Sequence, residues 1–161
     1  MSYYDECNPI GNVCKPQNAN KVRLNANTGG AGPLPIITTL FADPISVVDV
    51  SINANGMKNP SILLHFSGII SLPVGISVTL NFQIQRSLNG EGPIDVGSTY
   101  TFATLVTALE SEAFGFQFFD PDVAPGNYTY SVQLSTNSVI DITPGLTIVN
   151  ATLSALAVDN A

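Results

Sequence analysis

The fold is decided by residues 75–86, Gly75-Ile-Ser-Val-Thr-Leu-Asn-Phe-Gln-Ile-Gln-Arg86. Apolar residues occupy every second position from Ile76 to Ile84, and Ser, Thr, Asn and Gln fill the positions between them. Successive side chains of a β-strand point to opposite faces of a sheet. The alternation therefore predicts a strand with one buried face and one polar face.

The same period of two recurs along the chain, with turn residues every 8–15 positions. At 126–135 the residues predicted to point inward are Tyr128, Tyr130, Val132 and Leu134, and at 113–119 they are Phe114, Phe116 and Phe118. Five further segments have strand character: 35–41, 45–54, 61–70, 97–106 and 145–158. Asn-Gly, Asp-Pro and Asn-Pro pairs separate them, as expected of turns. Eight strands predict an all-β jelly-roll sandwich over residues 34–161, with an immunoglobulin-like sandwich as the alternative.

The N-terminal part of the chain differs in composition from this domain. Residues 1–24 are rich in Asn, contain both cysteines, and predict a flexible connector arm. Residues 25–33 predict a Gly-rich hinge at Gly29, Gly30 and Gly32, because glycine leaves the backbone free to adopt many conformations. Residues 1–33 carry two acids and three bases, whereas the remaining residues carry ten acids and two bases. The arm is therefore expected to be attracted to the domain of another copy.

Composition and charge exclude several classes of protein. The 161 residues have a net charge of −7 and only 11% charged side chains. No basic patch could neutralise several phosphates, so nucleic acid is not an expected partner. No stretch approaches the roughly 18 apolar residues that a membrane span requires, and the first residues lack the pattern of a secretion signal. No membrane partner is expected.

Residues that could carry catalysis are few. The single histidine, His65, alternates with Leu64 and Phe66 and is predicted to be a solvated strand residue. Because there is no second histidine and both cysteines lie in the arm, the spacing supports neither a Cys-His pair nor a transition-metal site. No G-x-S-x-G, P-loop, H-E-x-x-H or Rossmann motif occurs. We therefore expect no enzyme activity, no cofactor and no small-molecule ligand. Asp120 and Asp122 could ligate Ca²⁺, but a solvated loop is favoured because no third ligand is placed near them.

Cys7 and Cys14 are the clearest local feature, because the domain that follows contains no cysteine. If they are oxidised, they pair with each other or with the arms of other subunits, and otherwise they are reduced thiols. An extended arm of about 20 residues reaches roughly 60–70 Å, which is far enough to cross onto a neighbouring domain. The sequence thus permits cross-linking between subunits.

Several segments in order resemble a family of uncharacterised β domains from spore-forming Clostridia. They are Leu80-Asn-Phe-Gln-Ile-Gln85, Thr99-Tyr-Thr-Phe102, Glu110-Ser-Glu-Ala-Phe-Gly-Phe116, Tyr128-Thr-Tyr-Ser-Val132 and Ile148-Val-Asn-Ala-Thr-Leu-Ser154. Together with the arm, the layout is also similar to the endospore appendage subunits of Bacillus-type spores. That resemblance implies head-to-tail stacking, lateral sheet augmentation, and connectors that plug into earlier subunits through disulfides.

In this chain, Cys7 and Cys14 match the connector cysteines of the appendage subunits. The arm would be anchored in apolar grooves by Tyr3, Tyr4, Ile10 and Val13. The chain departs from the appendage subunits in one respect, because their domains contain acceptor cysteines and this domain has none. Arm-to-arm bonds or a non-covalent plug would replace them. The resemblance implies a structural subunit of an extracellular fibre on the spore surface, made of copies of itself and assembled in the mother cell without a signal peptide. The alternatives are a Ca²⁺-dependent carbohydrate-binding or adhesin module and a jelly-roll coat protein of a phage or virus.

Overall fold

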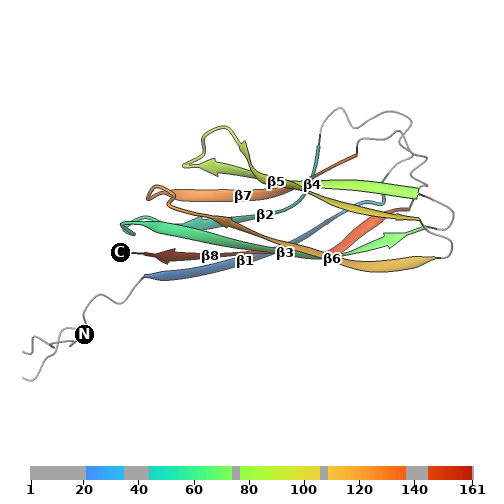
Figure 1. Cartoon of the computed structure of the whole chain (residues 1–161), viewed down its shortest axis with the longest axis horizontal. Helices are drawn as coiled ribbons and strands as arrows, with labels where there is room; N and C mark the ends of the chain where they lie inside the picture. Colours follow the sequence, from blue (N-terminus) through green and yellow to red (C-terminus); the bar gives the residue numbers. More distant parts are fainter. Residues whose placement is uncertain (1–20, 35–43, 74–76, 106–108, 137–144, 161) are drawn as a thin grey trace, which may run out of the picture.

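The computed structural model describes residues 21–34, 44–73, 77–105, 109–136 and 145–160, which form two facing antiparallel sheets (Figure 1). The strands of these residues are β1 (Val22–Ala31), β2 (Ile45–Asn53), β3 (Pro60–Leu72), β4 (Ser77–Leu88), β5 (Ile94–Leu105), β6 (Glu110–Asp120), β7 (Asn127–Ser135) and β8 (Thr147–Asp159). Sheet A has the strand order β1-β8-β3-β6, and sheet B has the order β2-β7-β4-β5.

This strand order is that of a jelly roll and confirms the predicted fold. The chain changes sheet at every step from β1 through β2 and β3 to β4, and again at every step from β5 through β6 and β7 to β8. In an immunoglobulin-like sandwich the first two strands would be neighbours in one sheet. Here β1 and β2 belong to different sheets, which excludes the alternative fold.

Most of the predicted strands agree with the structure. In β4, Leu80, Phe82 and Ile84 are buried, as the alternation predicts, and the four inward residues predicted in β7 are buried as well. His65 is exposed between buried Leu64 and Phe66, as predicted. The predicted strand at 35–41 lies outside the described residues.

The predicted Gly-rich hinge at 25–33 is wrong. Most of these residues belong to β1, which pairs with β8 without interruption from Val22↔Val158 to Gly29↔Ala151. The domain therefore begins with β1 rather than at residue 34. Residues 1–20 of the predicted arm lie outside the described residues, so the flexibility of that segment stays a prediction.

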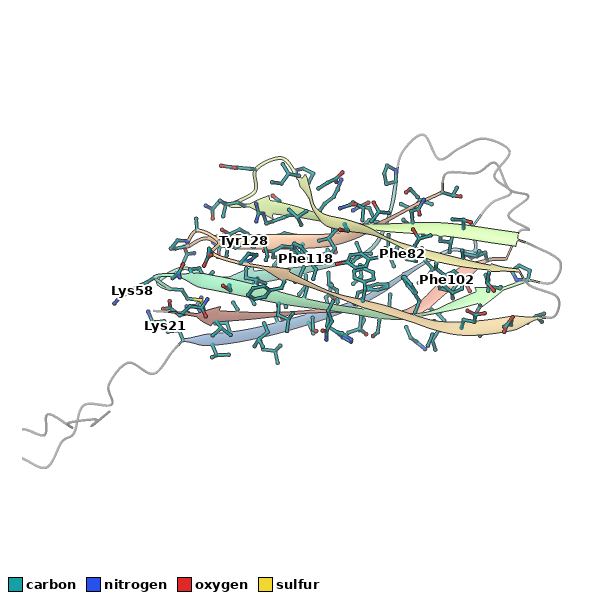
Figure 2. The ribbon with its side chains drawn as sticks, in the orientation of Figure 1. Lys21, Lys58, Phe82, Phe102, Phe118 and Tyr128 are labelled. Carbon is teal, nitrogen blue, oxygen red and sulfur yellow. The ribbon has the colours of Figure 1, made fainter. Side chains whose placement is uncertain are left out.

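The core lies between the two sheets and is filled by large side chains from both. Phe66 of sheet A and Phe82 of sheet B are buried, with ring centroids 5.7 Å apart. Figure 2 shows Phe82 and Phe102 in the layer between the sheets. Aromatic pairs at such distances add to the stability from apolar burial. Within the described part of the chain, no helix is long and apolar enough to cross a membrane.

The end of β8 is fastened to the turn between β2 and β3. Oδ1 of Asp159 accepts hydrogen bonds of 3.0 Å from the backbone N–H groups of both Lys58 and Asn59. The N–H of Asp159 in turn donates to the carbonyl of Lys21, at 2.9 Å. The hydrogen bond from Asn59 lowers the pKa of Asp159 below its ordinary value of 3.8, and the bond from Lys58 and the nearby lysine charges lower it further.

A lowered pKa in the folded state means that ionised Asp159 stabilises the fold above pH 3.8, and that this stability disappears as the pH falls through the folded-state pKa. We expect Asp159→Asn to lower the melting temperature at neutral pH, because its amide oxygen is a weaker acceptor than a carboxylate. The difference from wild type should vanish in acid, where Asp159 is itself neutral. Thermal unfolding of both proteins across this pH range checks the prediction, and a pH-independent difference would contradict it.

Candidate assembly surfaces

The two lateral sides of the sandwich are built differently, and the side formed by β1 and β2 is closed. Arg23 on β1 donates from Nη1 to the carbonyl of Asn53, at 2.6 Å, and from Nη2 to the carbonyl of Asn55, at 3.2 Å. Asn25 donates from Nδ2 to the carbonyl of Ser51, at 2.7 Å. Side chains of β1 thus satisfy carbonyls along the edge of sheet B that would otherwise be open to another strand.

Glycine at position 29 permits this closure. A Cβ on Gly29 would lie 2.3 Å from the carbonyl oxygen of Val47 on β2, which is shorter than any tolerated contact. A Cβ on Gly30 would lie 2.6 Å from the carbonyl oxygen of Ile148. Gly32 has a φ of 105° just after β1 ends. The glycines interpreted as a hinge therefore allow backbones to approach and the chain to turn.

The opposite side, formed by the edge strands β5 and β6, is held together by side chains. The hydroxyl of Tyr100 on β5 donates to the carbonyl of Gln117 on β6, at 2.9 Å. The ring of Tyr100 stacks on Phe116, with centroids 3.9 Å apart. Among the described residues, neither strand forms a ladder with the other, since β5 pairs with β4 and β6 pairs with β3. We call this the open side.

The edges on the open side carry little that would deter pairing with another chain. Residues 96–105 of β5 and 113–119 of β6 contain no charged residue and no proline. Natural edge strands are usually protected by lysine, proline or a bulge. The pairing of β5 with β4 is irregular between Val96 and Tyr100. The part of β5 with regular strand geometry, which another strand could pair with, therefore begins at Tyr100. These segments of β5 and β6 are candidate sites of strand addition.

The residues predicted to act in the arm, Cys7, Cys14, Tyr3, Tyr4, Ile10 and Val13, lie outside the described residues, and their roles stay predictions. The structure separates the two candidate calcium ligands. Asp120 turns inward, where its Oδ2 is 2.8 Å from Nη1 of Arg86 and 2.7 Å from the hydroxyl of Tyr130. Asp122 is exposed in the loop that follows β6.

Asp120 therefore forms an ion pair with Arg86. This corrects the hypothesis that Asp120 could ligate calcium beside Asp122. Its side chain is only 9% exposed, so a solvated loop is also the wrong description of this residue. In the ranges that the structure describes, no group of three or more His, Cys, Asp or Glu side chains is arranged to hold a metal ion.

A hollow that the sequence did not indicate lies near this ion pair, between the β4–β5 turn and the β6–β7 loop. Its volume is about 440 Å³, and its lining includes Leu88, Ile94, Tyr128, Glu91 and Asp122. The described lining contains neither histidine nor cysteine.

A jelly-roll domain with one closed and one open side is thus the class that the fold defines. Residues 20–158 match the family DUF4489, a domain of unknown function, and the chain belongs to that family. No curated protein matches the sequence significantly.

Solved structures resemble the chain at low identity. A chain of infectious bursal disease virus, Gx strain, is 11% identical with a TM-score of 0.46, and the match covers 89% of this chain and 33% of that one. The chain thus spans about a third of that viral chain. The xylan-binding domain CBM22-1 of Paenibacillus barcinonensis Xyn10C is 12% identical with a TM-score of 0.28, over 88% of this chain and 86% of that one. At these identities the likeness concerns the fold alone.

Proposed function

We propose that the chain is a self-assembling structural subunit of an extracellular protein fibre and not an enzyme. The observation that carries the proposal is the open side, where two long edge strands with uncharged central segments lie next to each other. Strand addition between copies would satisfy their outward backbone groups. On the closed side, side chains of β1 already bind carbonyls of β2, so the proposed pairing uses the open side.

A second link on a different surface is needed for a fibre, because pairing through the open side alone would give a closed dimer. In this proposal the N-terminal arm supplies the second link. The chain enters β1 at Val22, on the closed side and therefore away from β5 and β6 (Figure 1). Two different contacts per subunit, edge pairing and arm docking, make a heterologous assembly that continues as an open polymer.

The finer assignment, a spore appendage assembled in the mother cell, rests on the sequence resemblance described above. Cysteines confined to the arm would suit a fibre that is cross-linked once it meets oxidising surroundings. Negative-stain electron microscopy of the recombinant full chain, with and without a strong reductant, tests the proposal. We expect long filaments, and their loss in reductant would assign the cross-links to Cys7 and Cys14. A protein that stays monomeric in both conditions would contradict the proposal and favour the alternative binding module.

The open-side mechanism makes a sharper prediction for Thr101, an exposed residue in the regular part of β5. We expect Thr101→Lys to raise the critical concentration for polymerisation about tenfold, equivalent to ~1.4 kcal/mol per added subunit, because an incoming strand must accommodate the charge. Sedimentation of polymer across a concentration series measures it.

Thr129→Lys is the matched control. Thr129 is also exposed and also on sheet B, but its strand, β7, has a neighbour on both sides. Each substitution removes one side-chain hydrogen bond, Thr101 to Asn81 at 3.0 Å and Thr129 to Ser51 at 2.9 Å. Equal critical concentrations for the two variants would refute pairing through β5.

A further inference from the structure

A row of apolar side chains crosses all four strands on the outer face of sheet A. The register places Leu24 of β1 opposite Leu156 of β8, Leu156 opposite Leu63 of β3, and Leu63 opposite Phe119 of β6. Leu24 is 72% exposed and Phe119 is 56% exposed, while Leu63 and Leu156 are half-buried. We call Leu24, Leu63, Phe119 and Leu156 the apolar row. Large side chains at its two ends are left in water.

The apolar row lies in a face that carries no charge. In the next register position, exposed Val22 lies opposite Val158, which widens the apolar surface. The other outward-facing residues of the described strands of sheet A are small, polar or aliphatic, with His65 as the single titratable group and no Asp, Glu, Lys or Arg. A whole sheet face without a charge is unusual for a chain with a net charge of −7.

The outer face of sheet B has the opposite character. Its side chains hydrogen-bond to one another, as in Thr101 to Asn81 at 3.0 Å and Gln85 to Asp95 at 2.9 Å. It also carries acidic residues at Asp49 and Asp95, both of which are exposed. Polar side chains on the outer face of sheet B therefore bind one another, whereas the apolar row lies on sheet A.

We propose that the outer face of sheet A binds the same face of a second copy. Two copies repel each other over most of their acidic surface, and this uncharged face is where they can approach without repulsion. A two-fold axis that runs along the apolar row, or crosses its centre at a right angle, sets the row against the same row of the second copy, so that apolar side chains meet apolar side chains. Sheets packed in this way lie about 10 Å apart.

The available area is consistent with a real but modest interface. Four strands spaced about 4.8 Å apart, over about nine residues of 3.3 Å each, give a face on the order of 600 Å² per copy. Stable complexes bury about 800 Å² per partner, so we expect a weak dimer that dissociates on dilution. This pairing goes beyond the proposed fibre, which uses strand edges. The two surfaces are different, and filaments that use both would be paired.

Sedimentation equilibrium of the full chain over a micromolar concentration series tests the proposal, with Leu24→Asp and Phe119→Asp as separate variants. Below the concentration at which filaments form, wild type is expected to approach twice the mass of the chain, and each variant is expected to dissociate at least tenfold more readily. Both side chains are more than half exposed, so circular dichroism and the melting temperature should not change. Ser46→Asp is the control, because it adds the same charge at an exposed position of β2 in sheet B and should leave the dimer intact.

A wild-type protein that stays monomeric at the highest concentration, or a dimer that survives in both variants, would overturn the proposal. Where the wild type polymerises, mass per length in scanning transmission microscopy replaces sedimentation. Leu24→Asp should then give filaments of half the mass per length, and an unchanged value would overturn the proposal. Failure of the fibre proposal is distinguishable from failure of this one, since Thr101→Lys should raise the critical concentration for filaments but leave the dimer intact.

Discussion

Replacing Gly29 by alanine is expected to lower the free energy of unfolding by about 3 kcal/mol, at the upper end of the cost of overpacking a core. The added Cβ would lie 2.3 Å from the carbonyl oxygen of Val47 and 3.0 Å from Cβ of Val48. Both neighbours belong to β2, and the first is a backbone atom that cannot rotate away. The backbones of β1 and β2 would have to separate, which would strain the hydrogen bonds from Arg23 and Asn25 that close this side.

Gly92→Ala is the matched control for this prediction. No heavy atom lies within 4 Å of a Cβ at Gly92, and its backbone does not have a positive φ. We expect this variant to change the free energy of unfolding by less than about 0.5 kcal/mol, or to stabilise the fold slightly by restricting the unfolded chain. Urea denaturation of both variants measures the difference, and equal midpoints would show that β1 does not press against β2.

The failure to predict β1 has a physical cause. A strand is recognised in a sequence by apolar residues on its inward face, but β1 lies against β2, the edge strand of the opposing sheet. Its inward side chains, Arg23 and Asn25, meet the carbonyls of β2 rather than the core, while Leu24 points outward. The alternation is therefore inverted. Gly29 and Gly30 are needed because other backbones lie close to them. The inverted alternation and these two glycines together make the sequence of β1 resemble that of a linker.

Strands that face the core on one side were predictable because their pattern is local. The apolar row was not predictable, because it depends on the register between β1, β8, β3 and β6, which are distant in sequence. Arg86 did give a local signal. It follows Leu80, Phe82 and Ile84 on the inward face of β4, and a charge in that position requires a partner. The sequence did not show that the partner would be Asp120 rather than another acid.

The cluster of Asp120, Arg86 and Tyr130 joins the two sheets near one end of the sandwich, since Asp120 lies on sheet A and the other two on sheet B. Tyr130 is fully buried. Burial raises the pKa of its hydroxyl, and the hydrogen bond to Asp120 raises it further. Tyr130 therefore remains a donor to Asp120 at any pH at which the fold is stable. Asp120 is the acceptor on which both partners depend.

Asp120→Ala is expected to lower the free energy of unfolding by about 2–3 kcal/mol, because it leaves a buried hydroxyl and a partly buried guanidinium without an acceptor. The side chain of Arg86 is 25% exposed, so water recovers part of the loss, and the cost falls below the 3–5 kcal/mol of fully buried pairs. The triple variant Asp120→Leu, Arg86→Met, Tyr130→Phe should recover most of the stability, since no unpaired polar group remains.

The control is Asp122→Asn, two residues along the chain. Asp122 is exposed and has a φ of 50°, a conformation that asparagine adopts readily, so its replacement should cost less than about 0.5 kcal/mol. Urea denaturation with a common slope compares the variants. If Asp120→Ala and Asp122→Asn unfold at the same urea concentration, the buried cluster does not stabilise the sandwich. If the triple variant is as unstable as Asp120→Ala, the loss comes from packing rather than from unpaired polar groups.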